Sequence, residues 1–153
     1  MNGMWIAPFG AGLVATTALT LVVFLPSWFG LPKANMVLAL GKFIAHEKKL
    51  EQGLIPGLIV HYAVGIVFAW AYLLGFLWLE IPFSVLTGAM VGTVHGCIAM
   101  FVVGHLFLRG HPPQPSQGTE LKARIAAWAQ LAGHILYGSI VVGIYEVMVL
   151  YPR

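Results

Sequence analysis

The sequence predicts an all-α fold: an integral membrane four-helix transmembrane bundle with one cytoplasmic interfacial amphipathic helix. Four apolar runs are each long enough to span a bilayer, which takes about 20 residues. The 153-residue chain is 59% hydrophobic and 8% charged, whereas a typical soluble domain is about 25% charged. One segment between the runs also repeats apolar residues at helical spacing. We therefore expect a single transmembrane domain, residues 1–153, surrounded by the lipid bilayer.

The predicted spans cover about residues 6–28, 56–79, 83–108 and 122–150. Pro56 falls in the first turn of the second span, where its missing N–H group has no helical partner to lose. Thr119 can cap the start of the fourth span, and Glu120 suits the positive end of that helix. These local signals support the placement of two of the four helix starts.

The segment 35–50 is predicted to be an amphipathic helix that lies on the membrane surface. Its apolar residues recur at helical spacing, whereas lysines and a histidine fall on another side. The apolar positions are Met36, Leu40, Phe43 and Ile44.

Basic residues gather in the segments that follow the first and third spans. Loops rich in Lys and Arg stay in the cytoplasm, so both termini are expected outside it, in a prokaryotic inner (plasma) membrane. The start of the chain has no basic side chain and no clear cleavage site, so the first span should be retained. The basic residues are Lys33, Lys42, Lys48 and Lys49 in one segment and Arg109, Lys122 and Arg124 in the other.

Small residues mark the helix faces that we expect to pack together. The third span carries Gly88, Gly92 and Gly96 at intervals of four residues. Glycines at this interval let two helix backbones approach closely. Gly138 lies on a small and polar face of the fourth span. These four glycines are therefore predicted to be helix-packing residues.

Four histidines lie inside the apolar runs: His61, His95, His105 and His134. An ionisable side chain is costly in lipid, so each is a candidate functional residue. His95 and His134 are expected at similar depths near the middle of the membrane, and His61 and His105 at a second level. Two levels of paired imidazoles suit a bis-histidine haem b protein, and imidazole also binds copper, zinc or iron.

Hydrogen bonding within the bundle is the alternative role for these histidines. Gln130 precedes His134 by four residues and Tyr137 follows it by three, so partners on the same helix exist. We expect this role and predict no cofactor, with haem b as the alternative.

The chain offers no catalytic constellation. It contains no aspartate, its glutamates lie in loops or near a span end, and Cys97 is its only cysteine. Its basic residues flank the spans without forming a patch, so we expect no nucleic-acid partner. The sequence therefore predicts a non-enzymatic accessory subunit of a larger membrane complex, such as a respiratory or other electron-transfer complex. The alternatives are a haem b or metal-binding electron carrier and a small-molecule channel or transporter lined by Thr16, Thr20, His95 and Gln130.

Three stretches resemble a family of small uncharacterised four-span prokaryotic integral membrane proteins. They are GLVATTALTLVVFLPSWFGLPKANMVLALG, IVHYAVGIVFAWAYLL and GHILYGSIVVGIYE, and the similarity covers most of the chain. The family's His-x-x-x-Gly segment is matched by His61 and Gly65, and its Gly-His-x-x-x-Gly segment by Gly133, His134 and Gly138. The resemblance implies the four-span topology and carries no established activity.

Overall fold

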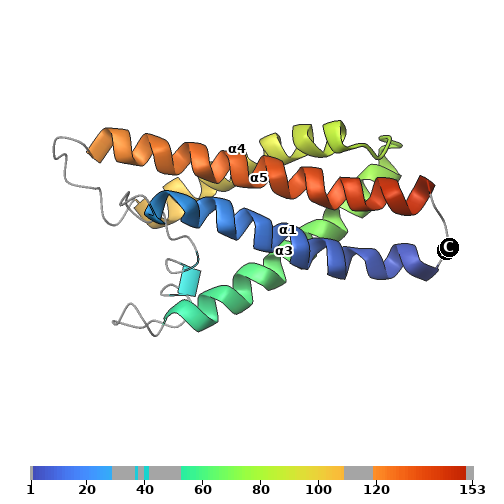
Figure 1. The fold of residues 1–153 in the computed structure, drawn as a ribbon, viewed down its shortest axis with the longest axis horizontal. Coiled ribbons are helices and arrows are strands. Elements are labelled where there is room, and N and C mark those ends of the chain that lie inside the picture. The colour runs from blue at the N-terminus through green and yellow to red at the C-terminus, as the bar shows by residue number, and fades with distance from the viewer. Residues whose placement is uncertain (1, 29–36, 38–39, 42–52, 109–118, 151–153) are drawn as a thin grey trace.

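The structure, a computed structural model, describes residues 2–28, 37, 40–41, 53–108 and 119–150. Its long helices are α1 (Asn2–Trp28), α3 (Leu54–Trp78), α4 (Val85–Leu108) and α5 (Thr119–Leu150), and the described residues contain no strand (Figure 1). Each helix is long and apolar enough to cross a membrane. A helix suits this task because it satisfies its backbone hydrogen bonds internally. The predicted all-helical fold with four candidate spans is confirmed.

The predicted interfacial helix at 35–50 lies largely outside the described residues, and the segment 109–118 between the third and fourth spans lies wholly outside them. Within the first segment, Val37, Leu40 and Gly41 are described, and all three are helical. A Cβ atom added to Gly41 would meet the backbone of Gly53 and Gly57. This short described piece therefore packs closely against the start of α3.

The helices are not packed equally against one another. Helix α5 lies between α1 and α4 and packs along both, and α1 packs against α3. Helix α3 touches α5 at fewer positions, and α3 and α4 make no extensive contact. The start of α1, the α3–α4 turn and the end of α5 lie at the same end of the bundle, on the right in Figure 1. The result is a bundle with a gap between two helices that are consecutive in the chain.

The buried core joins α1, α3 and α5. Alanines on α1 let aromatic and branched side chains of α3 and α5 fill the interior, and none of the described side chains of α4 belongs to this core. The core consists of Ala7, Ala11, Ala15, Leu19, Val23, Ala69, Tyr72, Leu73, Phe76, Tyr137, Val141, Val142 and Tyr145.

Helix α4 meets α5 through glycines. A Cβ atom added to Gly92 would lie against the carbonyl oxygen of His134 and 3.0 Å from the Cα atom of Ile135. One added to Gly138 would lie against the carbonyl oxygen of Gly88. At Gly96 it would lie 2.9 Å from the Cβ atom of His134. The two backbones approach too closely for larger residues, and this approach brings His134 beside α4.

Two tyrosine hydroxyls tie α5 to α3. Tyr137 donates a hydrogen bond to the carbonyl oxygen of Gly65, and Tyr145 donates one of 2.7 Å to that of Ala69. Both acceptors belong to small residues, which leave the helix backbone accessible. The bonds also satisfy buried hydroxyls that would otherwise be costly in an apolar interior. These two hydrogen bonds hold α3 against α5.

A tight turn connects α3 to α4. Glu80 has a φ of 55°, and the N–H of Ile81 bonds to the carbonyl oxygen of Phe76, which closes the end of α3. Ser84 and Thr87 cap the start of α4 by exchanging backbone-to-hydroxyl hydrogen bonds of 3.1 Å each. Glu146 on α5 accepts a hydrogen bond from the N–H of Val85. Hydrogen bonds therefore hold the turn at the end of α3 and at the start of α4, and the start of α4 is bonded to α5.

Candidate functional site

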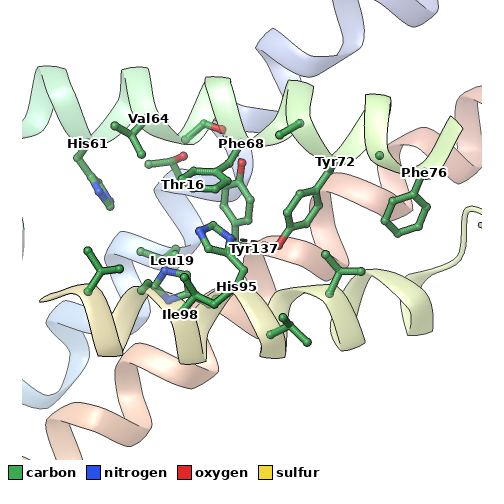
Figure 2. A pocket seen from close by; sticks show the side chains of 18 of the residues that line it. Thr16, Leu19, His61, Val64, Phe68, Tyr72, Phe76, His95, Ile98 and Tyr137 are labelled. Carbon is green, nitrogen blue, oxygen red and sulfur yellow. Dashed lines mark hydrogen bonds between the residues drawn. The ribbon is translucent and has the colours of Figure 1, made fainter. Parts of the chain in front are cut away.

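A cavity of about 500 Å³ occupies the gap between α3 and α4. Figure 2 shows side chains of α3 and α4 pointing toward each other across it, with α1 and α5 behind. The lining is almost entirely apolar and aromatic, and it includes three histidines. Of the residues that line it, none is acidic and none is Lys, Arg, Ser or Cys. The lining residues are Thr16, Leu19, His61, Val64, Gly65, Phe68, Ala71, Tyr72, Gly75, Phe76, Leu79, Ile81, Val91, Val94, His95, Ile98, Ala99, Val102, His134 and Tyr137.

The cavity reaches the outer surface of the bundle. Val94 and Ile98 of α4 line it and are 60% and 58% exposed. Val64 and Phe68 of α3 also line it and are exposed. These apolar residues lie within stretches long enough to span a membrane. The mouth of the cavity is therefore apolar and lies between the middle sections of α3 and α4.

The three histidines come from three different helices. His61 on α3 bonds through Nε2 to the hydroxyl of Thr20 at 3.1 Å. His95 on α4 bonds through Nδ1 to the hydroxyl of Tyr72 at 3.1 Å. His134 on α5 donates from Nδ1 to the carbonyl oxygen of Gln130 at 2.8 Å. Each histidine therefore makes a hydrogen bond within the bundle through one of its two ring nitrogens.

His95 and His134, predicted at one depth, are in contact. Their ring centroids lie 4.9 Å apart and their planes are almost perpendicular. The His95 ring also packs on Phe68, with centroids 4.1 Å apart. His61 lines the same cavity without ring contact to this pair, and the side chain of His105 lies outside the described residues. The structure therefore brings together three of the four candidate histidines in one cavity.

The geometry of the pair bears on the haem alternative. A haem with two axial histidines holds its porphyrin plane between the two imidazoles. Here the His95 and His134 rings touch edge to face, so they would have to separate for a macrocycle to enter. In the described part of the chain, no three His, Cys, Asp or Glu residues come together as a metal site would require. In this arrangement each ring of the pair makes one hydrogen bond within the bundle.

One fully buried side-chain oxygen in the site has no hydrogen-bond partner among the described residues. The hydroxyl of Thr16 is buried, makes no hydrogen bond, and lies against Gly65 on α3. Thr16 also lines the cavity. An unsatisfied buried hydroxyl is uncommon in proteins.

Sequence reasoning identified the histidines but missed the cavity and its aromatic lining. Phe68, Tyr72 and Phe76 recur at intervals of four residues on α3, and this periodicity marks one helix face. That signal could have grouped them with His61. It could not have shown that α4 stands away from this face.

The cavity combines apolar walls with a few hydrogen-bonding groups. The cavity offers imidazoles, phenols and one threonine hydroxyl, with no carboxylate to pair with them. Comparisons of the chain with protein-family models, with curated proteins and with solved structures found no match.

Proposed function

We propose that this chain is a non-enzymatic membrane protein that binds a lipid-soluble small molecule in the cavity between α3 and α4. The cavity itself carries the proposal. Its volume of about 500 Å³ lies within the range of about 300–1,000 Å³ found for ligand sites. Its composition also fits, since such sites combine apolar and aromatic walls with a few polar groups. Here those groups are His61, His95 and His134.

The route of entry follows from the exposed mouth. Val94 and Ile98 lie at the cavity and on the apolar surface of α4. A ligand dissolved in the bilayer can therefore enter sideways, between α3 and α4, without crossing an aqueous phase. Entry from lipid also explains why the walls carry no charged side chain.

The location and the assembly of the protein are part of the same proposal. We place the protein in a prokaryotic plasma membrane, in contact with lipid, as an accessory subunit of a larger membrane complex. The lack of a carboxylate among the residues that line the cavity supports a non-catalytic role. A bound apolar molecule would then be held for, or passed to, another membrane subunit.

Native mass spectrometry tests the binding. Protein released from mild detergent is expected to retain one molecule of para-octylphenol, a neutral probe with an apolar tail. Organic extraction of protein purified from its own membrane should also yield a lipid-soluble compound in near-stoichiometric amount. Release of bare protein at every probe concentration, with no extracted compound, would contradict the proposed function.

The membrane orientation gives a separate prediction. With the basic segments in the cytoplasm, a reporter fused after Arg153 should be active only outside the cytoplasm. One inserted next to Gln117 should be active only inside it. Paired alkaline phosphatase and green fluorescent protein fusions measure the two sides. The opposite pattern would invert the proposed topology and leave the cavity unaffected.

A further inference from the structure

We infer that the ligand of this cavity is a neutral lipid-soluble molecule that carries a hydroxyl group, such as an alkylphenol or a long-chain alcohol. The inference rests on the proposed function and names its ligand class. It follows from the hydrogen-bond partners of His61, His95 and His134, which determine what each imidazole presents to the cavity. In a neutral imidazole one ring nitrogen is a donor and the other an acceptor.

His134 presents an acceptor. Its Nδ1 atom lies 2.8 Å from the carbonyl oxygen of Gln130, and a carbonyl oxygen can only accept. Nδ1 therefore carries the proton, and Nε2 is the unprotonated nitrogen. Among the described residues, the His134 ring makes its hydrogen bond through Nδ1 and none through that Nε2 atom. A ligand that meets it must donate.

His61 also presents an acceptor, for a different reason. The hydroxyl of Thr20 donates its only proton to the carbonyl oxygen of Thr16, at 2.6 Å. Toward His61 the same oxygen can only accept, so Nε2 of His61 carries the proton. Nδ1 of His61 is left unprotonated. This second acceptor belongs to another part of the same cavity wall.

His95 presents a donor. The hydroxyl of Tyr72 lies 3.1 Å from Nδ1 of His95 and has no other acceptor among the described residues. The phenol proton therefore goes to Nδ1, and Nε2 of His95 carries the ring proton. Nε2 lies on the opposite side of the imidazole ring from Nδ1, so it faces away from Tyr72. Figure 2 shows the His95 ring between α3 and α4, beneath Phe68.

A donor and an acceptor therefore belong to the same cavity, on rings whose centroids are 4.9 Å apart. A hydroxyl group can accept from Nε2–H of His95 and donate to Nε2 of His134, which satisfies both. A ketone, an ester or a quinone can only accept, and would leave His134 unpaired. A carboxylate would meet unprotonated nitrogens at His134 and His61 and bring a charge into apolar surroundings.

Two matched probes test the ligand class. Para-octylphenol and para-octylanisole share the ring and tail and differ only in O–H against O–CH₃. We expect the anisole to bind the detergent-solubilised protein at least about tenfold more weakly, because the unpaired imidazole costs its full hydrogen bond. His134→Phe removes the acceptor that distinguishes the two probes and should bring the two affinities close together. His95→Phe, which keeps a ring against Phe68, should weaken both probes and preserve the preference. Thr93→Val, which removes a hydroxyl of α4 that does not line the cavity, should preserve the tenfold preference.

The outcomes separate this inference from the proposed function. Equal affinities for the two probes, or tighter binding of para-octylbenzoate, would overturn the hydroxyl preference while supporting an apolar site. Failure of every probe to bind would overturn both. Nitrogen-15 NMR of labelled histidine gives an independent measurement. We expect protonated Nε2 at His61 and His95 and protonated Nδ1 at His134, and the reversed tautomer at His95 or His134 would overturn the inference.

Discussion

Replacing Gly92 with leucine is expected to separate α4 from α5 and to destabilise the bundle by about 3 kcal/mol or more, at or above the upper end of ordinary overpacking. The first added carbon would already lie against the carbonyl oxygen of His134 and 3.0 Å from the Cα atom of Ile135. Backbone atoms cannot rotate away as a side chain can, so the helices themselves must move. The free energy of unfolding, measured by titration with a denaturing detergent, should fall accordingly.

Gly10→Leu is the matched control. Gly10 lies in the apolar helix α1, and a Cβ atom added there has no neighbour within 4 Å. The same substitution should therefore leave the stability nearly unchanged, or raise it slightly through the better helix propensity of leucine. Equal losses for Gly92→Leu and Gly10→Leu would show that close approach of α4 and α5 does not support the fold. Because Gly92 faces the backbone of His134, the Gly92 variant should also lose probe binding.

Replacing Gly75 with phenylalanine is expected to abolish binding of para-octylphenol without unfolding the protein. Gly75 lines the cavity, and a Cβ atom added there has no neighbour within 4 Å. The new ring would therefore enter the space that the ligand needs. We expect an affinity loss of more than about a hundredfold, since a filled site cannot repack around the probe. Native mass spectrometry and a thermal melt of the same sample measure binding and folding together.

Gly10→Phe serves as the control for this variant, because Gly10 is equally unconfined and lies outside the cavity. It should bind the probe as the unmodified protein does. Full binding by Gly75→Phe would place the ligand elsewhere on the molecule. Loss of binding together with a collapsed melt would mean that the glycine supports the fold, and Ala71→Phe, which fills the same cavity from an exposed position on α3, would then replace it as the test.

The histidines show which features of the site can be predicted from the local sequence and which cannot. The spacing of His95 and His134 from their helix ends predicted a similar depth, because a helix rises by a constant amount per residue. The structure places the two rings 4.9 Å apart. Their partners were only partly predictable. Gln130 could be named as a partner for His134 because it lies four residues away on the same helix. His95 and Tyr72 lie 23 residues apart in the sequence and on two different helices, so no local sequence pattern predicts the hydrogen bond between them.

By itself, the sequence determined the four long helices and their capacity to span a membrane. Both properties are local: each apolar run is long enough, and each helix satisfies its own backbone. Helix pairing is not local. An apolar helix face is solvated equally well by lipid and by a neighbouring helix, so the apolar character of a helix does not determine which helices pack together. Only the tertiary structure decided that glycines join α4 to α5, that Tyr137 and Tyr145 hold α3, and that a cavity opens between α3 and α4.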